Sequence, residues 1–122
     1  MKGSRMGNLT THVLDTANGV PAGGMHVTLL RVSGASTDKL MSLRLNDDGR
    51  ADAPLLEGAA FQRGRYRLIF SVAAYFRERG AEIPDPPFID EVQLDFGIAD
   101  ESLHYHVPLL VSPWSYSTYR GS

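Results

Sequence analysis

The chain contains no cysteine among its 122 residues. This absence excludes disulfide bonds, thiolate metal sites and a cysteine nucleophile, so packing and assembly must supply the stability. Long hydrophobic runs are missing too. No apolar segment approaches the roughly 20 residues that cross a membrane, and the N-terminus Met1–Met6 lacks the apolar part of a secretory signal. We therefore expect no membrane partner and predict a cytoplasmic location.

Neither sign of charge dominates, because 12 Lys and Arg oppose 14 Asp and Glu and leave a formal net charge of -2. This balance gives no broad attraction to phosphates, so we expect no nucleic acid partner. Hydrophobic residues make up 43% and charged residues 21%, which is typical of a globular domain. We place a single domain at residues 9–122, after an N-terminal extension of residues 1–8 that we expect to be flexible.

Short segments of alternating apolar and polar residues recur between Gly, Pro and Asn or Asp clusters, which is typical of an all-β sandwich or barrel. In the clearest segment, Tyr66–Val72, the apolar side chains share one face and Arg67 points the other way. We expect one helix, Ala73–Arg79, and an extended loop, Ala81–Pro87. The other predicted strands, about eight in all, are Leu9–Asp15, Met25–Val32, Leu40–Leu45, Asp52–Leu55 (weaker), Glu91–Ile98, Leu103–Val111 and Trp114–Arg120.

Three histidines are candidates for chemistry. A period of two puts His104 and His106 on one face of their segment, opposite an apolar face that includes Leu103 and Tyr105. His12 lies opposite Leu9 and Val13 in the same manner. A single histidine of this kind is most often a surface side chain. A pair two residues apart can also approach a metal ion, but no carboxylate or cysteine in the segment completes a metal site. We expect no metal and no other cofactor.

Arg50 follows the turn Asp47–Gly49, where an arginine is ordinarily a solvated charge. Its guanidinium also suits planar groups with several carbonyl oxygens. The strand pattern continues to the end of the sequence, so the last residues, Ser115–Ser122, form either an edge strand or part of a site. Pattern alone predicts a soluble β-sandwich and no specific activity.

Four blocks, Thr10–Asp15, Asp48–Arg50, His104–Leu110 and Tyr119–Ser122, together resemble the signature of the transthyretin-related 5-hydroxyisourate hydrolases over essentially the whole chain from Leu9. The ending Tyr-Arg-Gly-Ser is the most specific block, because transthyretin, a hormone carrier of the same fold, lacks it. One departure is Phe88–Val92, where many members carry Phe/Tyr-Phe-Pro-Glu-Val. We expect that difference to alter a loop and to leave the motif residues unchanged.

The resemblance implies a two-sheet transthyretin-like (prealbumin-like) β-sandwich with one short helix. It also implies a homotetramer, a dimer of dimers, whose inter-dimer channel contains the sites. The implied reaction is hydrolytic opening of 5-hydroxyisourate, the product of urate oxidase, in urate (purine) degradation. Catalytic roles are implied for His12, Arg50 and His106, and substrate-binding roles for Tyr119, Arg120, Gly121, Ser122 and, more weakly, His104.

In the implied mechanism, His106 or His12 activates a water molecule, and the other imidazole orients it or protonates the leaving nitrogen. Arg50 stabilises the oxyanion, and the Ser122 carboxylate orients an imidazole. Ser122 is disfavoured as a covalent nucleophile, because no nucleophile elbow precedes it. Two alternatives stay open: a transthyretin-like carrier of small ligands without catalysis, and a β-sandwich interaction module.

Overall fold

The alternating segments form nine strands, with one α-helix and one 3₁₀ turn, within residues 7–122, which are the residues that the structure, a computed structural model, describes. The strands are β1 (Asn8–Asp15), β2 (Val20–Pro21), β3 (His26–Ser33), β4 (Ser36–Arg44), β5 (Leu56–Glu57), β6 (Gly64–Ser71), β7 (Glu91–Ile98), β8 (Tyr105–Val111) and β9 (Tyr116–Thr118). The helix is α1 (Val72–Glu78), and the 3₁₀ turn is η1 (Gly58–Ala60).

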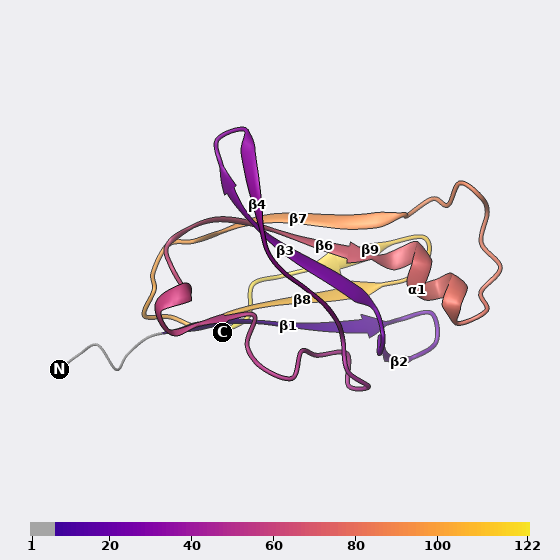
Figure 1. The fold of residues 1–122 in the computed structure, drawn as a ribbon. Coiled ribbons are helices and arrows are strands. Elements are labelled where there is room, and N and C mark those ends of the chain that lie inside the picture. Colours follow the sequence, from indigo (N-terminus) through magenta and orange to yellow (C-terminus); the bar gives the residue numbers. More distant parts are fainter. Residues whose placement is uncertain (1–6) are drawn as a thin grey trace.

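Two sheets lie face to face, and α1 lies at one end of them (Figure 1). The first sheet has the order β2-β1-β8-β9, with β5 also paired to β1, and the second has the order β4-β3-β6-β7. Strands β1 and β8 run parallel, whereas the other paired strands run antiparallel. This arrangement confirms the predicted all-β sandwich.

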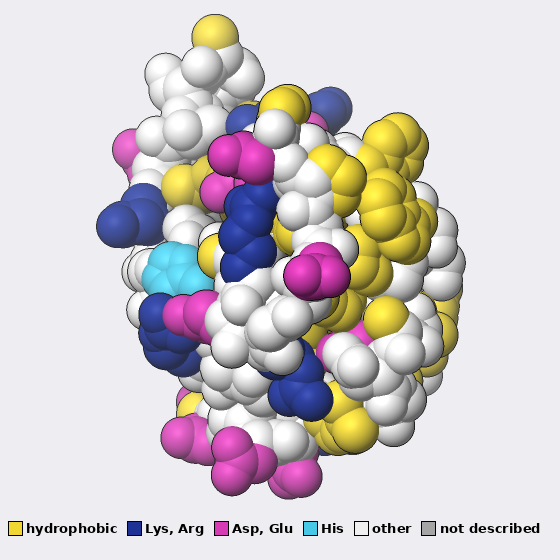
Figure 2. All heavy atoms as spheres, turned by 90° about the vertical axis from the view of Figure 1, so that its right-hand side faces the viewer, with side chains coloured by type: hydrophobic (Ala, Val, Ile, Leu, Met, Phe, Trp, Pro, Cys, Tyr) yellow, Lys and Arg dark blue, Asp and Glu magenta, His cyan; other side chains and the backbone are white. Residues whose placement is uncertain are grey.

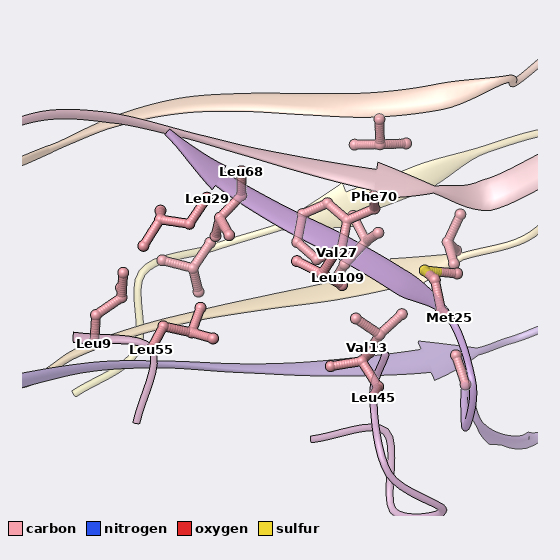
Figure 3. Packing of buried hydrophobic residues seen from close by; sticks show 14 of the residues in the cluster. Leu9, Val13, Met25, Val27, Leu29, Leu45, Leu55, Leu68, Phe70 and Leu109 are labelled. Atoms are coloured by element: carbon pink, nitrogen blue, oxygen red, sulfur yellow. The ribbon is translucent and has the colours of Figure 1, made fainter. Parts of the chain in front are cut away.

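The inner faces of the sheets supply the hydrophobic core. Alternate residues of β1 and β6 are buried, as the period of two requires. Figure 3 shows Val13 of the first sheet and Leu68 and Phe70 of the second projecting into the layer between the sheets. Because these inner side chains bury the apolar surface that stabilises the fold, the outer faces are free to carry polar groups.

The sequence predicts the central strands well and the short pairings poorly. Strand β7 has the predicted bounds, Glu91–Ile98. The weak strand at Asp52–Leu55 is wrong, because the ladder with β1 forms one step later, at β5. Strand β4 begins at Ser36 rather than Leu40, since its first residues are exposed and show no alternation in burial. The two-residue β2 and the turn η1 are too short to give a periodic signal.

The ends of two other predicted strands also differ. Strand β8 begins at Tyr105, and Leu103 is 45% exposed instead of buried, because a turn anchored on Asp100 occupies the preceding residues. Strand β9 covers only Tyr116–Thr118 of the predicted Trp114–Arg120. The Ser112 hydroxyl oxygen accepts hydrogen bonds from the two backbone amides that precede β9, which closes a turn where strand was expected.

The helix and the following loop agree with prediction to within one residue. Helix α1 begins at Val72, one residue early, and residues 81–87 form neither helix nor strand. Residues 1–6 of the predicted N-terminal extension lie outside the described residues. Gly7 and Asn8 belong to the domain instead, because Gly7 N donates to Glu101 O at 2.8 Å and Asn8 begins β1. No helix of the described part is long and apolar enough to span a membrane.

A buried carboxylate joins the end of β1 to α1. Asp15 accepts hydrogen bonds from the Tyr75 hydroxyl at 2.8 Å and from the Asn18 side-chain amide at 2.7 Å, and Arg79 lies 3.7 Å away. Burial raises the pKa of Asp15, but the hydrogen bonds from Asn18 and Tyr75 outweigh it and hold the pKa below its ordinary value. Asp15 therefore folds as a carboxylate, and its contribution to stability is lost as the pH falls through that lowered pKa.

We predict that Tyr75→Phe lowers the free energy of unfolding by about 1–3 kcal/mol, because a buried charged acceptor loses a hydrogen bond. Urea denaturation at neutral pH and fixed protein concentration measures the change. Tyr116→Phe is the matched control, since Tyr116 is 48% exposed and lies far along the chain from Asp15. Equal stability of wild type and Tyr75→Phe would contradict the role of this contact.

Candidate active site

Two histidines from distant segments lie on the outer face of the first sheet. In the parallel ladder of β1 and β8, Thr10 lies opposite His106 and His12 lies opposite Pro108. Their neighbours along each strand, such as Val13, are buried on the inner face, so both half-buried imidazoles project outward. The outward placement predicted from the alternation is therefore confirmed. His12 and His106 are therefore diagonal neighbours on adjacent strands, two residues out of register.

A tight turn brings Arg50 beside His12. The Asn46 side-chain oxygen accepts hydrogen bonds from two backbone amides of the turn, including that of Arg50 at 3.1 Å. Gly49 has a φ of 73°, and a Cβ at this position would collide with the carbonyl oxygen of Val13. Val13 N donates to Gly49 O at 2.9 Å, and His12 and Arg50 form a β-bridge. The turn needs glycine in order to approach β1 this closely.

The last residues of the sequence return to β8 and pair with His106. Gly121 N donates to His106 O at 2.7 Å, and His106 N donates to Gly121 O at 3.2 Å. A Cβ on Gly121 would lie 3.2 Å from the His106 Cβ and 3.3 Å from its ring Cδ2. Because these distances are tight for a carbon contact, the missing side chain at residue 121 leaves room for the imidazole.

The register of this tail sends two of its side chains to opposite faces. Thr118 pairs with Leu109 and Gly121 with His106, so the same register puts Tyr119 opposite Pro108, on the outer face, and Arg120 opposite Val107, on the inner face. The Arg120 guanidinium lies over the Tyr105 ring, 4.3 Å from its centroid, within a cleft of about 380 Å³ between β7 and the tail. The structure therefore places the Arg120 guanidinium away from the histidine face, whereas Tyr119 follows the outward register and also borders the cleft.

The two remaining predicted residues lie at the margin. His104 precedes β8, is exposed, and has its Nδ1 3.0 Å from Asn8 Oδ1. Ser122 is exposed and directly follows the residue that pairs with His106. The outer face thus brings together His12, Arg50, His106, Tyr119 and Gly121, with Ser122 and His104 at its edge.

Burial and neighbouring positive charge lower the pKa of both outward histidines. For His12, burial is the largest cause and the Arg50 guanidinium lowers the pKa further, whereas a backbone hydrogen bond and the charge of Asp48 act in the opposite sense. For His106, burial again comes first, followed by the charges of Arg50 and His12. The pKa of both imidazoles is therefore lowered from the ordinary value of histidine, which favours the neutral form that can accept a proton.

One further residue, Thr10, belongs to this face and is not among the residues that the sequence predicts. Its hydroxyl lies 2.8 Å from His106 Nδ1, and it lines a hollow of about 170 Å³ together with Arg50. The feature of the sequence that could have identified Thr10 is the alternation of side chains along the strand, which puts Thr10 on the same face as His12. The partner lies 96 residues away in sequence, so only the tertiary structure identifies the contact.

This arrangement fits the chemistry of hydrolysis. Neutral imidazoles can remove a proton from water, and a fixed guanidinium can stabilise negative charge that develops on a carbonyl oxygen. Residues 7–122 contain no group of three or more His, Asp or Glu side chains placed to hold a metal ion.

Known proteins carry the same pattern. The family model of the HIUase/Transthyretin family matches residues 9–121. The chain belongs to this family. A member from Ralstonia nicotianae, a 5-hydroxyisourate hydrolase, is 56% identical over 117 residues, which are 96% of this chain and 100% of that protein.

Two solved structures show the shared fold. An (S)-allantoin synthase has a TM-score of 0.91 and 47% identity, and the match covers 96% of this chain and 44% of the synthase chain. Sea bream transthyretin in complex with thyroxine has a TM-score of 0.83 and 25% identity, over 93% of this chain and 94% of that chain. The sandwich is thus transthyretin-like, as the resemblance of the sequence motifs implies.

We predict that Arg50→Met raises the pKa of both His12 and His106, because it removes the positive charge that disfavours each imidazolium. The pH titration of the ring resonances by NMR measures both midpoints, which should lie below the ordinary value of histidine in the wild type. Arg44→Met is the control, since Arg44 is an exposed arginine that pairs with Glu78. Unmoved midpoints in Arg50→Met would show that Arg50 does not face the imidazoles.

Proposed function

We propose that the protein hydrolyses 5-hydroxyisourate to 2-oxo-4-hydroxy-4-carboxy-5-ureidoimidazoline in urate degradation. The observation that carries this proposal is that His12, His106 and Arg50 lie together on one face of the first sheet. The tail borders this face, because Gly121 pairs with His106. The 56% identity to a 5-hydroxyisourate hydrolase over nearly the full length of both chains supports the same reaction.

The reaction begins with attack of water on a ring carbonyl. One imidazole removes a proton from the water as the new C–O bond forms, and a proton then reaches the nitrogen as the ring C–N bond breaks. His106 and His12 both suit these steps, because each is half-buried and has a lowered pKa, which favours the neutral imidazole. We assign the proton acceptor for water and the proton donor for the nitrogen to these two histidines, without specifying which histidine has which role.

Arg50 stabilises the oxyanion that forms at the attacked carbonyl, since its charge is fixed beside His12 by the glycine turn. Tyr119 lies on the same face and is placed to contact the substrate. Arg120 acts from the opposite face, where its contact with Tyr105 holds the tail against the sheet. Ser122 and His104, at the edge of the site, remain proposed substrate contacts.

We propose further that the protein assembles as a homotetramer, a dimer of dimers, in which a second subunit closes the site. Strands β7 and β9 are the last strands of their sheets and lie across one cleft, so both offer backbone groups for pairing. At the end of the molecule that carries α1, hydrophobic side chains gather along one side (Figure 2). The rings of Phe88 and Trp114, which are 75% and 55% exposed, have their centroids 6.4 Å apart and offer apolar surface to a second subunit.

The cytoplasmic location stays a prediction.

The carrier alternative shares the fold, as the likeness to sea bream transthyretin shows, but a carrier needs no proton acceptor. Two imidazoles with lowered pKa values beside a guanidinium favour a catalytic function over a function as a ligand carrier. The decisive experiment generates 5-hydroxyisourate with urate oxidase and follows its ultraviolet decay with and without the protein. An unchanged rate of decay would leave the carrier as the better reading.

We predict that His12→Ala and His106→Ala each slow the decay by roughly 10²-fold or more, the scale for losing a positioned acid or base. Circular dichroism should be unchanged, because neither side chain belongs to the buried core. His26→Ala is the control, since His26 lies in β3 of the other sheet. Turnover near the wild-type rate in both site variants would refute the assignment.

We predict that Gly121→Val lowers turnover at least 10-fold, the range for displacing a positioned proton acceptor, because its side chain presses on the His106 ring. Gly97→Ala is the control, as its new Cβ meets only one backbone oxygen at 3.9 Å. Light scattering and the melting temperature test whether both variants keep the assembly. A fully active Gly121→Val would place the tail outside the site.

A further inference from the structure

The Thr10 hydroxyl takes no part in the hydrolysis proposed above, yet it makes a hydrogen bond to one of the two imidazoles. Its Oγ1 lies 2.8 Å from His106 Nδ1, and the two residues are opposite each other in the parallel ladder. Both side chains are half-buried, so water competes poorly for this contact. Within residues 7–122, the His106 ring makes no other side-chain hydrogen bond, which leaves Nε2 open.

We propose that Thr10 is a positioning residue that engages Nδ1 of His106 in every protonation state, so that Nε2 alone exchanges protons with water and substrate. The inference rests on the proposed function, because it concerns how His106 serves that reaction. A neutral imidazole carries one ring proton, so Nε2 can act as the base only when that proton is on Nδ1, and the Thr10 oxygen then accepts a hydrogen bond from Nδ1–H. Thr10 therefore suits both the neutral and the cationic ring.

The proton balance follows from this contact. When Nε2 takes a proton from water, the ring becomes an imidazolium, and the Nδ1–H that the neutral ring already carried continues to donate to Thr10 Oγ1. When Nε2 returns the proton to the leaving nitrogen, the ring is neutral again and still bonded to Thr10. The imidazole needs no rotation between the two steps, which keeps it aligned with the reacting atoms.

The ring is confined on its other flank as well. A Cβ on Gly121 would lie 3.3 Å from the His106 Cδ2, so the tail backbone borders the imidazole opposite Thr10. The charged and titratable groups that act on the ring are Arg50 from the turn and His12 from β1. Of the side chains around the ring, Thr10 is the one within hydrogen-bond distance of a ring nitrogen.

The test compares Thr10→Val, which removes the hydroxyl and keeps the β-branched shape, with Thr10→Ser, which keeps the hydroxyl. We expect Thr10→Val to lower kcat about 10-fold with little change in KM, and Thr10→Ser to retain most of the activity. Thr28→Val is the matched control, a half-buried threonine on the outer face of the other sheet. If Thr10→Val fails to fold, Thr10→Ala replaces it in the same comparison.

NMR titration of the His106 ring supplies a readout that does not depend on turnover. Losing an acceptor for Nδ1–H destabilises the imidazolium, so the pKa of His106 should fall in Thr10→Val and stay at the wild-type value in Thr10→Ser. Wild-type kcat and an unmoved titration in Thr10→Val would overturn the proposal, as would equal losses in the valine and serine variants. Inactivity of the wild-type protein would instead refute the hydrolase, and the NMR series would still test the contact.

Discussion

Strands β1 and β8 run parallel over seven residue pairs, from Leu9 and Tyr105 to Asp15 and Val111, and the histidine face depends on that ladder. The ladder is reinforced by the Thr11 hydroxyl, which donates to Val107 O at 2.7 Å. Because side chains alternate along a strand, a slip by one residue would exchange the inner and outer sets. The apolar inner residues therefore fix the register that also sets the histidines, and packing energy holds the site in place.

The same sheet serves two purposes with its two faces. The inner face buries Leu9, Val13 and Leu109 completely, and the outer face carries imidazoles that are only half-buried. Partial burial is enough to lower the pKa of both histidines while leaving them open to a ligand. Asp15, at the end of β1, is fully buried in contrast to the histidines, and its carboxylate needs several hydrogen bonds to remain charged.

The tail divides its residues between these faces. Arg120 reaches the inner side and lies over Tyr105, whereas Gly121 runs beside His106 with no side chain between them. One short segment thus both anchors itself on the sheet and borders the candidate site. The residues of the motif Tyr119–Ser122 therefore do not all face the histidines. Beside it lies the cleft between β7 and the tail, at the edge strands to which we assign the proposed subunit contact.

The sequence by itself determined the sandwich, the main strands and the outward direction of His12 and His106, because a period of two is a local property of the backbone. Its motif blocks also determined the family. Only the tertiary structure decided that Thr10 meets His106, that Gly49 lets Arg50 approach His12, and that Arg120 faces away from the histidines. These contacts join segments that are separated in the sequence, by 96 residues for Thr10 and His106, and the strand register that brings them together is set by packing of the whole core rather than by any local pattern.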